Sequence, residues 1–128
     1  MVVLDTHAWL WWMSAPKLLS VAARAAIEHS DELRVPAICC WEVATGVERG
    51  RIELDRDVTE WLRLALAPGN VTLAAITPAI ASEAARLGRD FQGDPGDRLI
   101  VATARVLGGG LVTKDERIRA FRKVDAIW

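Results

Sequence analysis

Short apolar runs alternate along the chain with longer segments of helical periodicity. Residues 1–4 (MVVL) form an apolar run that ends at Asp5 and Thr6, a pattern typical of a buried strand in a parallel sheet. Further apolar runs predict strands at residues 33–36, 71–76, 111–112 and 124–128. Helical signals predict helices at residues 18–27, 38–49, 58–66, 78–87, 97–107 and 118–121.

Turn and capping residues punctuate this pattern. Gly50 ends one predicted helix, while Thr77 and Pro78 open another as N-cap and first helical residue. Strands that alternate with helices predict an α/β fold, a three-layer α/β/α sandwich around a central, mainly parallel sheet. Ligands of such sheets bind beyond the carboxyl ends of the strands, so the polar residues that follow the strands are the first candidates for a site.

The composition is that of a folded domain. With 128 residues, 52% apolar and 26% charged, the chain predicts a single domain over residues 1–128 and excludes a disordered or collagen-like protein. The formal charge of -1 means that nucleic acid would have to bind through local patches. No signal peptide or apolar run of about 20 residues is visible. The adjacent Cys39 and Cys40 suit a reducing compartment, so we expect a cytoplasmic protein.

Four acidic residues stand out by their positions: Asp5, Glu42, Asp97 and Asp115. Three of them also fit a purely structural role. Asp5 fits the N-cap of a short helix that starts near His7, and Asp97 fits the first turn of its helix. Residues 113–116 (TKDE) fit a capping box that would include Asp115. For each of these three residues taken singly, the sequence favours neither the structural role nor a role in a functional site.

Glu42 is different because it lies in the middle of a predicted helix and cannot be a cap. Its neighbours one helical turn away are all uncharged: Ile38, Cys39, Thr45 and Gly46. A lone carboxylate on such a face costs several kcal/mol to desolvate, unless it is protonated, paired or bound to a metal. Glu48, in contrast, can pair with Arg51 at helical spacing and is expected to be a solvated surface acid.

Carboxylates that the fold brings together would need a cation. Two unit charges about 4 Å apart repel by roughly 4 kcal/mol at an effective dielectric near 20, and a divalent ion offsets that repulsion. Ligands that are all oxygens favour Mg²⁺ or Mn²⁺ over zinc. An ion held in this way is suited to bind phosphate oxygens and to activate a water, so the acids indicate phosphoryl chemistry.

Four segments resemble the motifs of one known family. Residues 2–7 (VVLDTH), 41–43 (WEV), 93–100 (GDPGDRLI) and 111–115 (LVTKD) are similar, in order and spacing, to the four motifs of PIN-domain nucleases, specifically the VapC-type toxins of bacterial and archaeal toxin–antitoxin pairs. The resemblance spans nearly the whole chain. It implies an endoribonuclease that depends on Mg²⁺, for which Mn²⁺ may substitute. It also implies a homodimer that a VapB-like antitoxin holds inactive.

The same resemblance implies roles for individual residues. Asp5 and Asp97 become the direct metal ligands, and Glu42 and Asp115 complete the catalytic acids. Thr6 and Thr113 are candidates for polar support. Hydrolysis of an RNA phosphodiester would then use the ion to stabilise charge on the phosphate and on the leaving 3′ oxygen, while a carboxylate orients the attacking water. Gly96 departs from the pattern, because relatives often carry a bulkier, commonly aromatic residue there, and we expect this to affect local packing more than chemistry. Asp94 is assigned to capping, since Asp-Pro suits an N-cap followed by a first-turn proline.

Several other residues have both a structural and a functional reading. We expect His7 to pack or hydrogen-bond locally rather than act as a base. The aromatic stretch Trp9, Trp11 and Trp12 is read as a protein interface rather than a surface that stacks RNA bases. Cys39 and Cys40 are expected to be small buried residues without a metal.

Two groups of basic residues are candidates for contacts with an RNA backbone. One comprises Arg49 and Arg51. The other comprises Lys114, Arg117, Arg119, Arg122 and Lys123, and is the better candidate because it lies beside Asp115.

Two other function classes fit the same acids. A phosphatase with Asp5 as nucleophile is the alternative enzyme, but the second acid expected two residues later is missing, because His7 stands there. A non-catalytic module that binds metal or RNA through the same acidic pocket is the other alternative.

Overall fold

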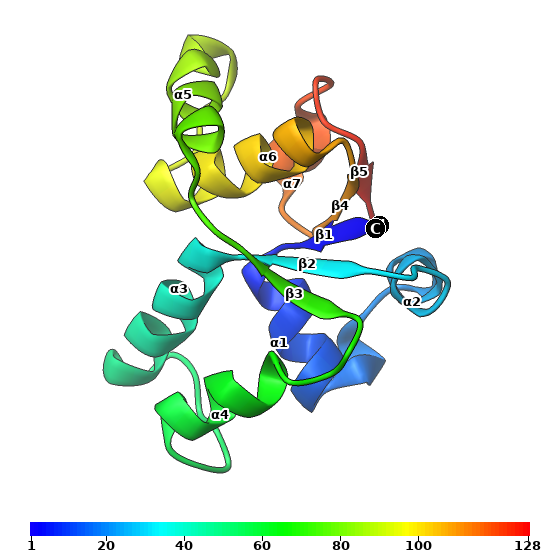
Figure 1. The fold of residues 1–128 in the computed structure, drawn as a ribbon, viewed down its shortest axis with the longest axis vertical. Coiled ribbons are helices and arrows are strands. Elements are labelled where there is room, and N and C mark those ends of the chain that lie inside the picture. Colours follow the sequence, from blue (N-terminus) through cyan, green and yellow to red (C-terminus); the bar gives the residue numbers. More distant parts are fainter.

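The computed structural model describes residues 1–128 and contains a five-stranded, entirely parallel sheet (Figure 1). The strands are β1 (Val2–Leu4), β2 (Leu33–Pro36), β3 (Val71–Ala74), β4 (Gly110–Val112) and β5 (Ala126–Ile127). Their order across the sheet is β3-β2-β1-β4-β5. All five predicted strands are present, and the last is shorter than expected.

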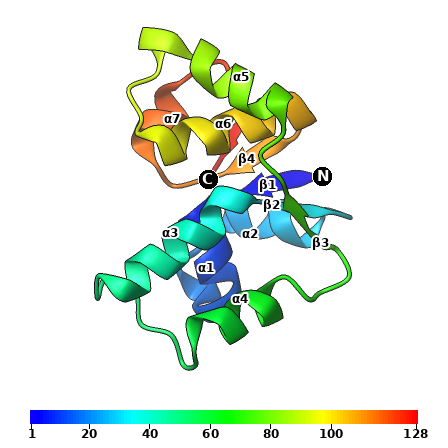
Figure 2. The same cartoon turned by 60° about the vertical axis from the view of Figure 1, so that its left-hand side comes forward.

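Seven helices cover the two faces of the sheet: α1 (Thr6–Ser14), α2 (Val21–Glu28), α3 (Ala37–Glu48), α4 (Val58–Ala65), α5 (Pro78–Arg86), α6 (Pro95–Leu107) and α7 (Glu116–Ala120). Helices α5, α6 and α7 lie on one side and α1 to α4 on the other, as Figure 2 shows. The predicted three-layer α/β/α sandwich is therefore confirmed. None of the helices combines the length and apolar character that a membrane crossing requires.

The sequence raised α1 only as the short helix that Asp5 would cap, and the six predicted helices differ from the structure near their ends. The helix expected from residue 18 begins only at Val21, because Pro16–Leu18 form a separate 3₁₀ turn and the Ser20 hydroxyl caps α2 by accepting from the Ala23 N–H at 3.0 Å. A second 3₁₀ turn spans Gly88–Asp90. Thr77 caps α5 as expected, with its hydroxyl oxygen accepting from the Ile80 N–H at 3.2 Å.

The aromatic residues of α1 divide between the core and the surface. Trp9 is completely buried, and its ring packs against that of Trp61 with centroids 5.3 Å apart. Trp11 and Trp12 are only half-buried. The interpretation of Trp9 as an interface residue is therefore wrong, because α1 packs this side of its helix against the core beneath β1. Cys39 is buried as expected, Cys40 is half-buried, and both thiols are free.

The order of the strands creates a crevice at one edge of the sheet. The chain starts in β1, moves outward through β2 and β3, and then returns to β4 on the other side of β1. The connections that leave β1 and β4 therefore diverge, and ligands of doubly wound sheets bind at such a point. Because Leu4 pairs with Val112 in register, Asp5 and Thr113 emerge side by side there.

Candidate active site

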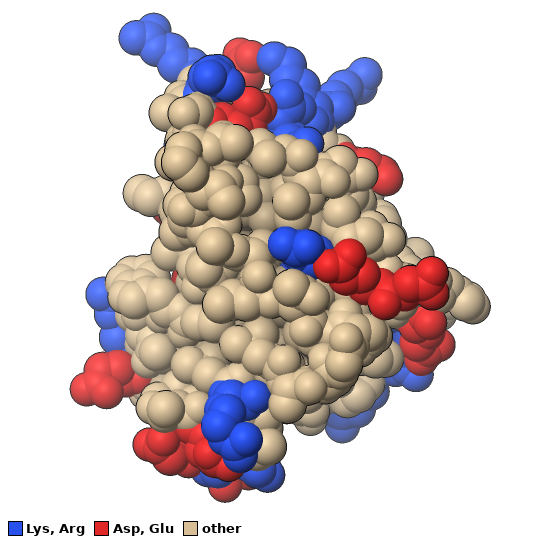
Figure 3. All heavy atoms as spheres, in the orientation of Figure 1, with Lys and Arg blue, Asp and Glu red and all other residues tan.

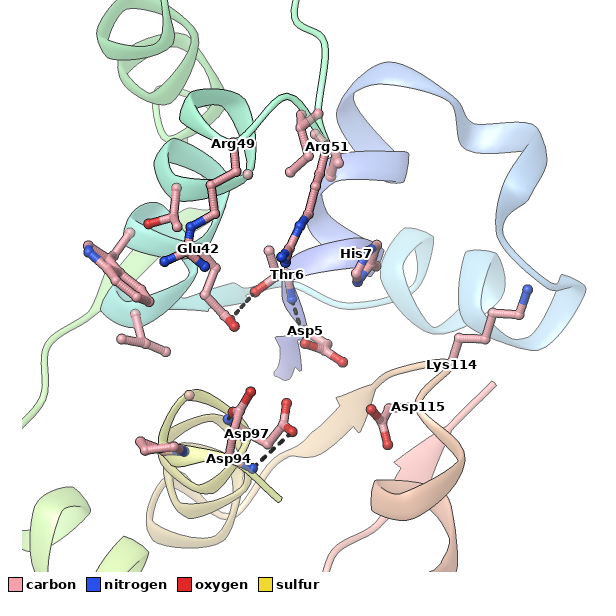
Figure 4. A pocket seen from close by; sticks show the side chains of 18 of the residues that line it. Asp5, Thr6, His7, Glu42, Arg49, Arg51, Asp94, Asp97, Lys114 and Asp115 are labelled. Atoms are coloured by element: carbon pink, nitrogen blue, oxygen red, sulfur yellow. Dashed lines mark hydrogen bonds between the residues drawn. The ribbon is translucent and has the colours of Figure 1, made fainter. Parts of the chain in front are cut away.

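A cleft of about 1090 Å³ opens at the carboxyl ends of β1 and β4. Its walls come from α1, α3, the first turn of α6 and the segment that leads from β4 into α7. Figure 4 shows the predicted acids, namely Asp5, Glu42, Asp97 and Asp115, facing this common space from different elements. The fold thus brings together side chains that are up to 110 positions apart in the sequence.

Asp5 is the most deeply buried of the acids, with 8% of its surface exposed. One carboxylate oxygen accepts from the Thr6 N–H at 2.7 Å, which caps α1, and the other accepts from the Thr113 hydroxyl at 2.5 Å. Burial raises the pKa of the Asp5 carboxyl, while these two hydrogen bonds act in the opposite direction. Asp5 is therefore held in a fixed orientation at the bottom of the cleft.

Glu42 faces the cleft from the middle of α3, as its uncharged neighbours predicted. Its Oε1 accepts from the Thr6 hydroxyl at 2.6 Å, and burial followed by the nearby Asp5 and Asp94 raises the pKa of its carboxyl. The predicted pair between Glu48 and Arg51 does not form: Glu48 is exposed and makes no ion pair. Glu48 does, however, point away from the cleft as expected.

Asp94 and Asp97 form a reciprocal capping box at the start of α6. The Asp97 N–H donates to Asp94 at 2.8 Å, and the Asp94 N–H donates to Asp97 at 3.4 Å. The capping role of Asp94 is confirmed, and its side chain also lines the cleft, which the sequence did not indicate. Burial, followed by repulsion from Asp94 and Asp115, raises the pKa of Asp97 to about 6. The buried position and the neighbouring carboxylates thus make the ionised form of Asp97 less stable than that of a free aspartate.

Asp115 is itself the N-cap of α7, where it accepts from the N–H groups of Arg117 and Ile118 at 2.9 and 3.1 Å. The predicted capping box would make Thr113 the N-cap of this helix. The structure places the N-cap two residues later, at Asp115, so that prediction is wrong. Thr113 instead accepts from the Asp115 N–H at 3.1 Å. The Arg117 guanidinium lies 3.4 Å from Asp97 and 3.8 Å from Asp115, and so bridges the two acids.

Gly96 allows the first turn of α6 to approach α3 closely. A Cβ atom at this position would lie 2.9 Å from Glu42 Oε2 and 3.3 Å from Asp94 Oδ1. A larger residue at position 96 would therefore displace the Glu42 carboxylate unless the helix moved. The departure at Gly96 thus affects the acidic site directly, and not only local packing as the sequence suggested.

Aromatic and basic side chains form the upper walls of the cleft. The exposed His7 ring packs against Trp11, with centroids 5.5 Å apart, and so makes the local contact that was expected of it. The Lys114 ammonium lies 5.6 Å from the centre of the Trp11 ring. Arg49 and Arg51 line the opposite side. Of the basic group after β4, only Lys114 and Arg117 reach the cleft.

The charge of the protein is distributed in local groups. Figure 3 shows Lys and Arg side chains together with Asp and Glu at the α5 end of the molecule, and a row of mixed charges that crosses the otherwise largely uncharged middle. A formal charge of -1 therefore coexists with basic groups large enough to contact a polyanion.

The chemistry of the cleft fits a hard divalent cation. Its donors are carboxylate and hydroxyl oxygens, which Mg²⁺ and Mn²⁺ prefer. Asp5, Glu42 and Asp97 all have raised pKa values, with burial as the first cause. No three His, Cys, Asp or Glu side chains are gathered closely enough to form a complete ligand cage. An ion bound here would complete its shell with waters, as Mg²⁺ commonly does.

The parallel sheet and its acidic cleft define an α/β protein with a candidate site for a cation. The sequence model of one family, described as the PIN domain, matches residues 2–126. The chain therefore belongs to the PIN domain family, as the motifs predicted.

Individual relatives agree with this assignment. The chain is 49% identical over 121 residues to Ribonuclease VapC22 of Mycobacterium tuberculosis (strain ATCC 25618 / H37Rv), and the match covers 94% of this chain and 92% of the relative. A toxin-antitoxin complex from Klebsiella pneumoniae contains a chain with a similar fold (TM-score 0.70, 20% identity, 97% of this chain and 95% of the other covered). VapBC2 from Rickettsia felis, solved with promoter DNA, is similar in fold as well (TM-score 0.71, 12% identity, 98% and 97% covered).

We predict that Thr113→Val lowers the free energy of unfolding by about 1–3 kcal/mol. Valine keeps the shape of the fully buried Thr113 but removes the donor to Asp5 and the acceptor for the Asp115 N–H. Thr113→Ser should retain most of the stability, because it keeps the hydroxyl. Urea unfolding curves measure the difference.

Thr72→Val is the matched control, because Thr72 is exposed on β3 and makes no side-chain hydrogen bond. It should change stability by less than about 0.5 kcal/mol. Equal losses in Thr72→Val and Thr113→Val would show that the buried hydroxyl does not stabilise the site.

Proposed function

We propose that this PIN-domain protein is the toxin of a toxin–antitoxin pair and acts as a metal-dependent endoribonuclease on RNA phosphodiester bonds. The observation that carries the proposal is the convergence of Asp5, Glu42, Asp97 and Asp115 on one cleft at the point where the strand order reverses. The relative named a ribonuclease, which is 49% identical over nearly the whole chain, supports the same activity.

The side chains divide the work of the reaction. Asp5 and Asp97 would hold Mg²⁺, or Mn²⁺ in its place, and Glu42 and Asp115 complete the acidic site. When bound, the ion supplies charge neutralisation at the phosphate and a water of lowered pKa. Thr6 holds one oxygen of Glu42, so the carboxylate keeps a fixed orientation. With a raised pKa, Glu42 is suited to orient the attacking water and accept its proton at a carboxylate oxygen.

The alternative of a phosphatase with Asp5 as nucleophile is disfavoured by the surroundings of Asp5. Both carboxylate oxygens already accept hydrogen bonds, from Thr6 and Thr113, and the residue is 8% exposed. Two residues later stands His7, whose ring packs on Trp11, where a general acid would be required. A non-catalytic binding module remains the alternative that cleavage assays test directly.

The proposed partners follow from the same surfaces. We infer a VapB-like antitoxin, because the structural neighbours include a toxin-antitoxin complex and VapBC2. We also propose a homodimer, as the resemblance to VapC-type toxins implies. The α1 face that carries Trp11, Trp12 and Met13 is partly exposed, and its Met13 borders a hollow of about 430 Å³ beside α4. It offers apolar area that a helical segment of an antitoxin could bury. The free cysteines fit the reducing cytoplasm.

Replacing either metal-binding aspartate should abolish cleavage. Asp5→Asn and Asp97→Asn should each lower the rate of RNA cleavage in Mg²⁺ by at least about 100-fold, because outer-shell changes alone cost 10- to 100-fold. In EDTA, Asp97→Asn should melt at the wild-type temperature or a few degrees above it, since one repelling charge is removed. Cleavage and melting are measured on the same preparations, and Mg²⁺ should raise the melting temperature of the wild type only.

Wild-type rates in either variant would refute the assignment of these ligands. A wild-type protein that cleaves no RNA in Mg²⁺ or Mn²⁺ would refute the proposed activity itself and favour a binding module.

Glu42 and Glu48 provide a contrast within one helix. Glu42→Gln should reduce cleavage by about 10- to 100-fold, because it removes a negative charge and a proton acceptor from the cleft. Glu48→Gln should leave the rate unchanged, since Glu48 is exposed and outside the cleft. Initial rates at the same Mg²⁺ concentration decide the question, and equal effects would show that the uncharged face of α3 does not mark a site.

Inhibition by the antitoxin should depend on arginine. A crowded carboxylate cleft without a bound cation is a receptor for a guanidinium group, which presents a planar fork of donors to carboxylates. We expect an antitoxin segment to bury the α1 face and to place an arginine among the acids. Co-expression with the adjacent reading frame, pull-down and an RNA cleavage assay test this. Full inhibition by a partner with every arginine changed to glutamine would disprove the charge-replacement mechanism.

A further inference from the structure

Helix α3 presents one continuous face to the cleft. The face consists of residues spaced at helical intervals: Ile38, Trp41, Glu42, Thr45, Gly46 and Arg49. Only Glu42 among them is used by the proposed reaction. An aromatic ring therefore lies beside the catalytic acid, and an arginine follows about two turns, or about 12 Å, further along the same helix.

Trp41 is unusually open for a tryptophan. It is 61% exposed, whereas Trp9 is fully buried and Trp61 is 7% exposed. The ring-to-ring contacts in the protein involve Trp9, Trp11, Trp61 and Trp128, and none involves Trp41. Trp41 thus exposes a large aromatic surface within the cleft, next to Glu42, and contributes little of that surface to the core.

Arg49 and Arg51 are free to bind an anion. Both are exposed, both line the cleft, and neither makes an ion pair. Arg117, in contrast, is already engaged by Asp97 and Asp115. Figure 4 shows the side chains of Arg49 and Arg51 extending toward Glu42 and Thr6 rather than away from the cleft.

We propose that this wall is a subsite for single-stranded RNA, in which Trp41 stacks on an unpaired base beside the scissile phosphate and Arg49 and Arg51 contact neighbouring phosphates. The inference rests on the proposed ribonuclease function and specifies the form of its substrate. Two features of this wall fit the same ligand, a single strand of RNA. The exposed Trp41 ring can stack on the face of a base, and the unpaired Arg49 and Arg51 guanidinium groups can bind the phosphate backbone. Both groups lie on the wall that carries Glu42, where the substrate of the proposed reaction must bind, and this favours RNA over a protein as the occupant.

The subsite selects for unpaired RNA. In a duplex, both faces of each internal base are covered by its neighbours, whereas a splayed single strand can offer a face to an aromatic side chain. Stacking on an indole depends little on the identity of the base. Trp41 should therefore set a preference for single-stranded regions rather than for one sequence.

The experiment measures binding in EDTA, where metal-dependent cleavage cannot occur. The probes are a fluorescein-labelled ten-nucleotide oligoadenylate and the same backbone with abasic riboses. Trp41→Ala should weaken binding of oligoadenylate about tenfold, and Trp41→Phe by no more than about threefold. Binding of the abasic backbone should be the same for Trp41→Ala and the wild type, because no base remains to stack.

Salt dependence separates the phosphate contacts from stacking. On a single strand, each phosphate contact contributes about 0.7 to the steepness of log affinity plotted against log salt concentration. The double variant Arg49→Gln with Arg51→Gln should therefore make this plot less steep by about 1.4. Trp41→Ala should leave the slope unchanged. Lys17→Gln with Arg24→Gln is the charge-matched control, since both residues are exposed and lie outside the cleft.

Several outcomes would overturn the subsite. They are wild-type affinity for oligoadenylate in Trp41→Ala, equal weakening on the abasic backbone, or an equal loss of slope in the Lys17 and Arg24 control. Dissociation of a dimer by Trp41→Ala in light scattering would assign the ring to a protein interface instead. If Trp41 governs binding while the wild type cleaves no RNA in Mg²⁺, the subsite stands and the nuclease proposal fails.

Discussion

The crowding of negative charge at the carboxyl ends of β1 and β4 is the constraint on which the site depends. The protein accommodates this charge locally: Asp5, Asp94 and Asp115 each occupy the N-cap of a helix, where backbone N–H groups and the helix dipole stabilise an anion. The Thr113 hydroxyl then joins Asp5 to the backbone of Asp115. Capping and the proposed metal binding are therefore compatible for Asp5, because a carboxylate oxygen that accepts one hydrogen bond keeps a second lone pair.

Much of the fold could be predicted because a buried parallel strand corresponds to a short, continuous apolar run in the sequence. Each apolar run became a strand, and the alternation with helices was sufficient for the three-layer arrangement. Helix α1 was the least predictable element, since its apolar residues surround the helix and no periodicity marks a buried side. Which tryptophan enters the core is decided by the packing of α1 and α4, where Trp9 meets Trp61. That contact joins residues 52 positions apart, and no local pattern encodes it.

The site was predictable to the extent that it follows the ends of strands. Asp5 and Asp115 stand there, and Glu42 stood out because an isolated acid on an uncharged helical face requires a reason. Arg49 and Arg51 were candidates for RNA contacts but ranked below the basic group after β4, because only the tertiary fold turns these two side chains toward Glu42. Asp94 was predicted as a helix cap. That its side chain also lines the cleft depends on how α6 packs against α3, which no local pattern shows.

The packing of helix α3 fixes the positions of the side chains that it contributes to the cleft. Cys39 and Val43, both completely buried, anchor the side of the helix next to Glu42 in the core, and this fixes the rotation of the helix. Gly46 then lets Ile52 pack tightly against it, because a Cβ atom there would lie 2.5 Å from the end of the Ile52 side chain. With its rotation fixed, the helix directs Glu42 toward Gly96 in the first turn of α6. A rigid helix, rather than a flexible loop, therefore carries Glu42 and Trp41 and holds them at constant spacing, while Arg49 and Arg51 follow at its end.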